Sequence, residues 1–124
     1  MPKKDDLIER LTDFAVRIIK LSTSLPKNQL GRHIASQLLR SGTAAGANYE
    51  EARAAESRAD FVHKLGIVVK ELKESNYWLQ LIQQTCLVKP PRLQALLQEA
   101  EELCAIIGRS VMTAKRKLQP KSPA

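Results

Sequence analysis

Aromatic residues and cysteines are scarce in this sequence. Phe, Trp and Tyr make up 4% of the chain against 44% apolar residues in all, so the core must be built mainly from aliphatic side chains. No apolar run approaches the roughly 20 residues of a membrane span, and the opening MPKKDDLIER contains no apolar leader. We therefore expect a cytoplasmic protein without a membrane role. Cys86 and Cys104 are too few for the disulfide framework of a secreted domain and are interpreted as small apolar residues on helix faces.

Acidic residues are absent from two long stretches. Residues 14–49 and 108–124 each contain five bases and no acid, whereas acids outnumber bases in the rest of the chain; the net charge is +7. Two basic zones of this kind attract polyanions, chiefly nucleic acid. The alternative interpretation is a soluble surface with a solvated basic tail.

Helical spacing dominates the distribution of apolar residues. Three runs alternate steps of four and three, as a helix with one buried face requires, and no stretch alternates apolar and polar residues as a strand would. The sequence therefore predicts an all-α protein. The three runs are Leu7, Leu11, Phe14, Ile18, Leu21 and Leu25; Phe61, Leu65, Val68, Leu72, Ser75, Leu79, Ile82 and Cys86; and Leu93, Leu96, Ala100, Leu103, Ile107, Ser110, Ala114 and Leu118.

Prolines and capping residues mark the element boundaries. Pro26 disfavours helix in the residue before it, the Ser57–Asp60 spacing is typical of a capping box, and Pro90-Pro91 stops one helix and starts the next. Because the connections are short, sequential helices should be antiparallel, which gives an up-down-up-down four-helix bundle. We expect a single domain over residues 1–118 with helices near 5–24, 30–54, 58–86 and 92–118, followed by a flexible polar tail over 119–124.

The stretch RSGTAAGANYEEA, residues 40–52, could be a phosphate-binding loop, a linker or a helix. A phosphate-binding loop needs Lys-Ser/Thr after its second glycine, whereas Gly46 is followed by Ala47-Asn48. A helical stripe also continues through the segment, from Leu30 to Ala52. We therefore predict a helix in which Gly42 and Gly46, four residues apart on one face, allow another backbone to come close.

Asn48 lies on that stripe and is a candidate buried polar residue. A buried amide needs hydrogen-bond partners, which Lys70, Glu71 or Ser75 on the third helix could supply. Polar groups buried between helices often determine register or oligomeric state.

Residues able to carry catalysis are few. Asp60 and His63 have the spacing of half a di-metal site, but Leu30 takes the corresponding place before His33, so the second half is missing. Neither cysteine has an evident base, and the carboxylates of the third helix are interpreted as partners in helix pairs. We expect no enzymatic activity, no metal and no cofactor.

Nucleic-acid binding is the sharper hypothesis. Aromatic residues do not interleave with the bases, so contacts should be to phosphates, tolerant of sequence and sensitive to salt. The cluster at 115–117 also suits the negative end of a helix, which is the structural alternative. The candidate nucleic-acid-binding residues are Arg17, Lys20, Lys27, Arg32, Arg40, Lys115, Arg116 and Lys117.

The block from Arg40 to Ile82, about a third of the chain, resembles the four-helix-bundle family that includes proteins encoded in intervening sequences of 23S ribosomal RNA genes. The resemblance is carried by the small-residue run from Arg40-Ser41 to Asn48, by EEA at 50–52, by ESRADF at 56–61, by KEL at 70–72 and by YWL at 77–79. It implies a left-handed bundle that assembles into a homopentamer. A related branch, the accessory proteins of diversity-generating retroelements, pairs with a reverse transcriptase and binds nucleic acid.

Resemblance and residue pattern together predict self-assembly. The third helix carries apolar residues beyond its buried stripe, including Trp78, and these favour a further partner; the alternative is that Trp78 is an isolated core residue. We therefore expect a non-enzymatic homo-oligomer that binds RNA or RNA/DNA. The alternative is a scaffold for another protein, with no nucleic-acid role. The residues assigned to an oligomer-forming or structural polar cluster are Ser41, Asn48, Lys70, Glu71, Tyr77 and Trp78.

Overall fold

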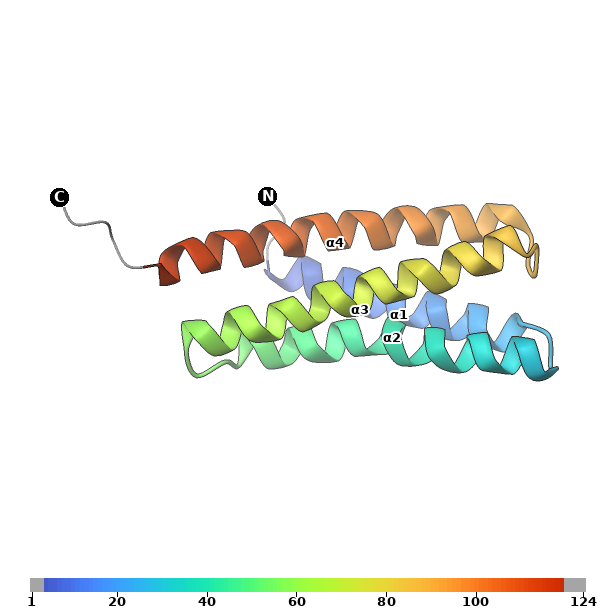
Figure 1. Ribbon diagram of the computed structural model, residues 1–124, viewed down its shortest axis with the longest axis horizontal. Helices are drawn as coiled ribbons and strands as arrows, with labels where there is room; N and C mark the ends of the chain where they lie inside the picture. The colour runs from blue at the N-terminus through green and yellow to red at the C-terminus, as the bar shows by residue number, and fades with distance from the viewer. Residues whose placement is uncertain (1–3, 120–124) are drawn as a thin grey trace.

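The structure, a computed structural model, describes residues 4–119 and is all-α over that range (Figure 1). The helices are α1 (Lys4–Ser24), α2 (Gln29–Arg53), α3 (Arg58–Gln84) and α4 (Pro90–Leu118), and no strand occurs among the described residues. Their packing is that of a bundle, as the spacing of apolar residues predicted. Of the tail expected over 119–124, only Gln119 is described; the remainder lies outside the described residues.

Side-chain caps begin the two middle helices. The Asn28 side chain accepts a 2.9 Å hydrogen bond from the Gly31 backbone N–H, and the Ser57 hydroxyl oxygen accepts a 3.1 Å bond from the Asp60 backbone N–H. Each cap satisfies a donor that the first helical turn leaves without a partner. The fourth helix begins instead with two prolines, Pro90 at its first position, because proline needs no N–H partner there.

The end of α3 is two residues earlier than the spacing predicted. Cys86 has φ 56°, in the left-handed region, so the helix cannot continue through it. The N–H groups of Cys86 and Leu87 turn back to the carbonyl oxygens of Gln83 and Ile82, both at 3.2 Å. This is a Schellman motif, in which glycine is the residue usually found at the Cys86 position.

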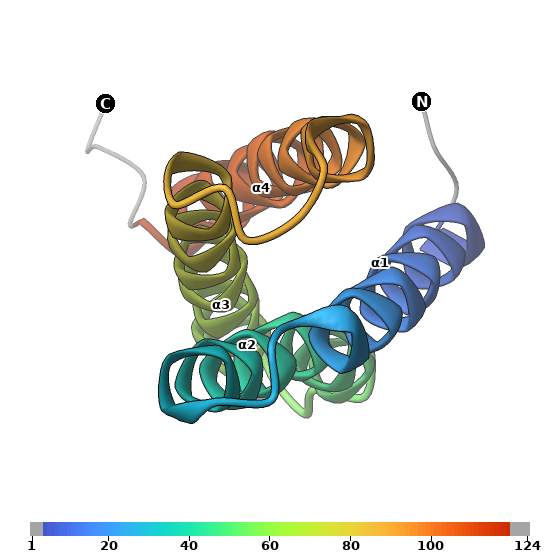
Figure 2. The same cartoon turned by 90° about the vertical axis from the view of Figure 1, so that its right-hand side faces the viewer.

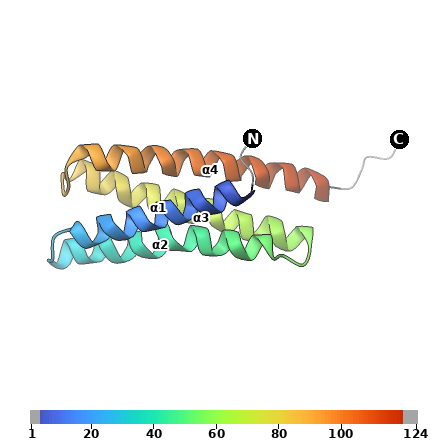
Figure 3. The same cartoon turned by 180° about the vertical axis from the view of Figure 1, so that it is seen from behind.

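The connections lie alternately at the two ends of the molecule. Figures 1 and 3 show the α1–α2 and α3–α4 connections at one end, which we call the two-connection end, and the α2–α3 connection at the other. Helix α2 packs along α1 and α3, and α3 along α4, whereas α1 and α4 approach each other only over a short stretch. Figure 2, a view from the two-connection end, shows α1 and α4 diverging.

The core is aliphatic, with Phe14 as its one fully buried aromatic side chain among the described residues. The predicted stripe of α1 is buried along its whole length. The stripes of α3 and α4 are buried over their central turns. The largest fully buried side chains are Leu11, Phe14, Ile18, Leu38, Leu65, Val68, Leu72, Leu79, Ile82, Leu93, Leu103 and Ile107.

Helix α2 buries most of the predicted stripe but departs from it at two positions. Leu30 is 53% exposed and Asn48 is only half-buried, while Tyr49 is buried. Leu30 and Asn48 are eighteen residues apart, about five turns, so they share one edge of the helix. That edge lies beside the core rather than in it.

The prediction of an uninterrupted helix through residues 40–52 is confirmed. A Cβ added at Gly42 would lie 2.7 Å from the Ile18 side chain of α1, closer than such atoms can approach. A Cβ at Gly46 would meet Leu11 at 3.7 Å, an ordinary contact. The narrow part of α2 is therefore at Gly42, and it is filled by α1.

Candidate nucleic-acid interface

The fold brings two acid-free stretches together at the two-connection end. Residues 14–49 form the second half of α1 and most of α2, and residues 75–98 form the end of α3 and the start of α4; neither range contains Asp or Glu. Each stretch contains one helix connection, α1–α2 in the first and α3–α4 in the second, and both connections lie at this end (Figures 1 and 3). We call the bases gathered there the basic end: Arg17, Lys20, Lys27, Arg32, Lys89 and Arg92.

Few contacts within the protein neutralise these charges. Arg17 lies 3.6 Å from Asp13, whose side chain is 64% exposed, so the pair is weak and screened by solvent. The Lys27 ammonium donates to the Thr23 carbonyl oxygen at 3.0 Å, which leaves its charge intact. Lys20 and Arg32 are exposed. The end therefore presents uncompensated positive charge to solvent, as phosphate binding requires.

Sequence reasoning missed Lys89 and Arg92. Both fall within residues 50–107, where acids outnumber bases, and averaging over that long segment hid them. The signal was a shorter acid-free run, 75–98. The fold is what places this run beside residues 14–49.

The charge of Arg40 is compensated within the protein, although its side chain is half exposed. Its guanidinium donates to Glu71 at 3.2 Å and also to Glu74, both on α3. The indole N–H of Trp78 donates to the same Glu74 carboxylate at 3.1 Å. Arg40 therefore links α2 to α3, with two carboxylates against its single positive charge.

The expected polar cluster is assembled in part. Ser41 and Ser75, both fully buried, have hydroxyl oxygens 2.9 Å apart and hydrogen-bonded between α2 and α3. Asn48 instead donates to the Ala44 carbonyl oxygen of its own helix at 2.9 Å, because it lies at the edge of the core. Lys70 is exposed and lines a separate surface cavity with His63.

Aromatic rings collect beside this cluster. The rings of Trp78 and His33 meet edge to face with centroids 5.9 Å apart, and Tyr77 meets Trp78 in the same way at 5.3 Å. Trp78 is half-buried against the core, whereas Tyr77 is 55% exposed. The T-shaped geometry is the favourable one for aromatic pairs.

The bases predicted at 115–117 lie far from the basic end. Lys115, Arg116 and Lys117 are exposed in the last turn of α4, and Figure 1 shows that turn at the opposite end of the molecule. The eight predicted bases therefore do not form one surface. The last-turn position is also where cations suit the helix dipole.

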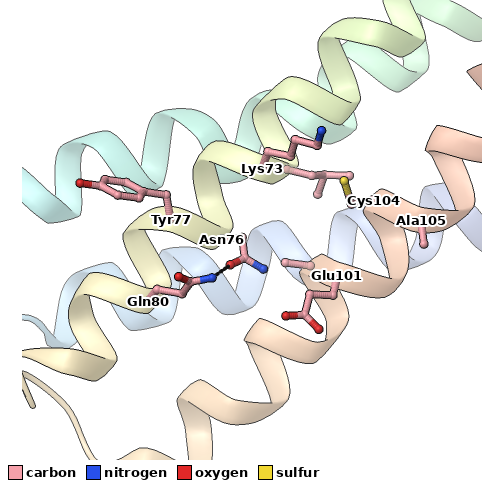
Figure 4. A pocket seen from close by; sticks show the side chains of 9 residues that line it. Lys73, Asn76, Tyr77, Gln80, Glu101, Cys104 and Ala105 are labelled. Atoms are coloured by element: carbon pink, nitrogen blue, oxygen red, sulfur yellow. Dashed lines mark hydrogen bonds between the residues drawn. The ribbon is translucent and has the colours of Figure 1, made fainter.

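A cavity of about 500 Å³ between α3 and α4 contains the half-buried cysteine (Figure 4). Figure 4 shows the Cys104 sulfur pointing from α4 towards α3, near Lys73. Burial raises the pKa of the Cys104 thiol, and Lys73 lowers it by less. The neutral thiol is therefore favoured, which is the opposite of what a cysteine nucleophile needs.

Neither a metal site nor a membrane span occurs among the described residues. Within residues 4–119, no three His, Cys, Asp or Glu side chains lie together as a metal site would need; His33 contacts Trp78, and His63 lines the cavity with Lys70. None of the helices described is both apolar and long enough to cross a membrane.

Known proteins resemble this chain over most of its length. The family model of the 23S rRNA-intervening sequence proteins matches residues 3–109. A crystal structure of a protein of unknown function from the S23 ribosomal protein family of Bacteroides thetaiotaomicron is similar, with 35% sequence identity and a TM-score of 0.79, over 85% of this chain and 97% of the other. No curated protein matches. Together with the helical bundle described above, these matches show that the chain belongs to the 23S rRNA-intervening sequence protein family.

Proposed function

We propose that this chain is a non-enzymatic, self-assembling protein of the cytoplasm that binds RNA or RNA/DNA through its basic end. Its subunit is the left-handed, up-down-up-down bundle that the short connections and the family resemblance imply. The assembly is a homopentamer. A reverse transcriptase or another protein is the partner that would fit this role.

The observation that carries the nucleic-acid role is the absence of carboxylates from the two stretches that meet at the basic end. Six bases from three helices and two connections stand there, and within residues 4–119 the carboxylate contact they make is the weak one between Arg17 and Asp13. Backbone phosphates would be attracted without competition from acids of the same end. Because these bases are exposed lysines and arginines, binding should tolerate changes of base sequence.

Self-assembly is supported by apolar side chains outside the core. Val16 and Ile19 on α1 are 41% and 45% exposed, and Leu39 on the adjoining α2 is 40% exposed. A second copy could cover these side chains. Multi-angle light scattering tests this: a mass near five chains is expected, and a monomeric mass at micromolar protein would contradict it.

The nucleic-acid role is tested by fluorescence polarisation with a labelled RNA hairpin. We expect binding at about 50 mM salt and a slope of about −4 in a plot of log affinity against log salt, as for about five phosphate contacts. Replacing the hairpin by one of unrelated sequence should change the affinity little. No binding at micromolar protein and low salt would remove the proposed role.

A second candidate function is that of a protein scaffold. It is favoured by an apolar cavity of about 570 Å³ at the end opposite the basic end, which Leu7, Phe61, Leu65 and Ile106 line beside Arg58, Arg109 and Lys117. A partner segment with apolar and acidic side chains would fit there. Co-purification of a defined protein that survives nuclease treatment and is lost in Phe61→Ala would favour this role.

A further inference from the structure

Three bases of the basic end surround a cavity in the seam between α1 and α4. Arg17, Lys20 and Leu21 of α1 face Arg92, Ala95 and Leu96 of α4 across a space of about 340 Å³. On each helix the three residues are spaced i, i+3, i+4, which places them on one face. The space exists because α1 and α4 pack together only over a short stretch. Its size is at the lower end of small-ligand sites.

Arg92 occupies a position that costs stability unless an anion is nearby. It lies in the first turn of α4, where the helix dipole is positive, and that turn contains no acid and no side-chain cap. A cation there is repelled by the positive end of the helix dipole. Pro90 and Pro91 have no N–H, so an anion at this helix end would be held mainly by side chains.

The charges that face the cavity match a dianion. Arg17, Lys20 and Arg92 line it, and among residues 4–119 the one carboxylate in contact with them is Asp13, 3.6 Å from Arg17. The next acid along α4, Glu99, is already held by Arg10 at 2.6 Å. A phosphodiester carries one negative charge, whereas a phosphomonoester carries about −1.5 to −2 at pH 7. Three bases therefore favour the monoester.

The apolar floor and the small size narrow the ligand further. Leu21 and Leu96 are buried and offer an apolar surface to a sugar or base face beside the phosphate. A phosphate inside a strand is joined to a nucleotide on each side, so the strand would have to pass out of the cavity in two directions. A terminal phosphate is joined to one nucleotide, so the strand leaves the cavity in one direction only. Resting on the nucleic-acid role proposed above, we infer that the α1–α4 cavity binds the 5′-phosphorylated end of a nucleic-acid strand.

The test compares one RNA oligonucleotide in two forms, 5′-phosphorylated and 5′-hydroxyl, both with a 3′-fluorescent label. Polarisation titrations are run with the full chain, with Arg92→Gln and with Lys115→Gln, a control of equal charge change at the other end. We expect the full chain to prefer the phosphorylated form by about fivefold or more, as for charge-assisted hydrogen bonds. The preference should fall to about one in Arg92→Gln and persist in Lys115→Gln.

Equal binding of both RNAs by the full chain would overturn the inference and leave the proposed function standing. Adenosine 5′-monophosphate and adenosine, titrated by NMR, separate the remaining cases. If no RNA binds while the monophosphate binds in preference to adenosine, the nucleic-acid role fails and the cavity is a mononucleotide site. If neither RNA nor adenosine 5′-monophosphate binds, both proposals fail. Circular dichroism verifies that Arg92→Gln is folded, and Arg17→Gln replaces it if it is not.

Discussion

At the scale of single residues, two glycines in one helix have opposite environments. Gly42 is buried against Ile18, where a Cβ would lie 2.7 Å from the Ile18 side chain, whereas a Cβ at Gly46 would lie 3.7 Å from Leu11. Alanine favours helix over glycine by about 1 kcal/mol at either position. Steric conflict should outweigh that gain only at Gly42, because Ile18 is fully buried and cannot move aside.

We therefore predict that Gly42→Ala lowers the free energy of unfolding by about 1–3 kcal/mol, whereas Gly46→Ala leaves it unchanged or raises it by up to about 1 kcal/mol. Urea unfolding of both variants measures the difference. Each serves as the control for the other. Equal effects in the two variants would contradict the close approach of α1 to α2 at Gly42.

The residue that ends α3 predicts a stabilising substitution. Cys86 adopts φ 56°, which a side chain disfavours and glycine does not. Cys86→Gly should raise the free energy of unfolding by about 0.5–1 kcal/mol, seen as a higher melting temperature. Cys86→Ser keeps a side chain at the same φ and is the control. A glycine variant that is less stable than the original protein would mean that the Cys86 side chain makes a stabilising contact that outweighs the strain of its positive φ.

The two thiols should differ in reactivity. Cys86 is exposed, whereas burial raises the pKa of Cys104 above its ordinary 9.0. With an aromatic disulfide reagent at pH 8, Cys86 should react quickly and Cys104 slowly, measured in Cys104→Ser and Cys86→Ser. Because the folded state holds the Cys104 proton more tightly, its contribution to stability is complete below pH 9 and is lost as pH rises through the folded pKa. Equal rates at pH 8 would contradict this burial.

At the scale of the helices, the sequence predicted α1 better than α2. The residues from Leu7 to Leu25 form a single stripe that the structure buries throughout, since one face of a helix repeats at nearly this spacing. In α2 small residues cover both flanks of the stripe, so apolarity alone could not distinguish Asn48 from Tyr49 as the buried position. The ion-pair partners of Arg40 could not be predicted from the sequence either, because Glu71 and Glu74 lie 31 and 34 residues away in the chain.

Arg10 of α1 makes ion pairs across the sparse seam to α4, with Glu99 and, at 3.6 Å, with Glu102. Arg10 contacts Glu99 through two hydrogen bonds of 2.6 and 3.0 Å, and the two side chains are 31% and 16% exposed. This hydrogen bond is the main reason why the pKa of Arg10 is raised. Partial burial should make the pair stronger than an ordinary surface pair, although solvent still screens it.

A double-mutant cycle with Arg10→Ala and Glu99→Ala should give a coupling free energy of about 1 kcal/mol, measured by chemical unfolding. The exposed pair of Arg53 and Glu50, 3.0 Å apart within α2, provides the comparison and should give less than half of that. A coupling near zero for Arg10 and Glu99 would show that this pair does not help to hold α1 to α4.

At the scale of the whole molecule, the basic end is formed by the fold, which brings together bases from separate segments of the chain. The sequence indicated which stretches are basic, but the meeting of residues 14–49 and 75–98 required the order of the connections. The same reasoning placed Lys115, Arg116 and Lys117 with the other candidates, although α4 carries them to the far end. Proximity along the chain could not reveal this separation.

Two variants with equal charge change test whether location matters. Lys20→Gln, Lys27→Gln and Arg32→Gln together should reduce the steepness of the salt dependence of RNA binding by about three units, since each lost phosphate contact removes about one. Lys115→Gln, Arg116→Gln and Lys117→Gln together should change it by less than one unit. Equal losses in polarisation titrations would mean that binding follows net charge alone.

The crowding of bases at one extremity of an elongated bundle has a consequence for orientation. A nucleic-acid strand would bind the molecule at its basic end, so that the long axis of the bundle points away from the strand. In a ring whose rotation axis runs along the bundles, every copy would present this tip on the same side. Such an assembly would have two different faces. One face would bind nucleic acid through five basic ends, and the opposite face would stay accessible to other molecules.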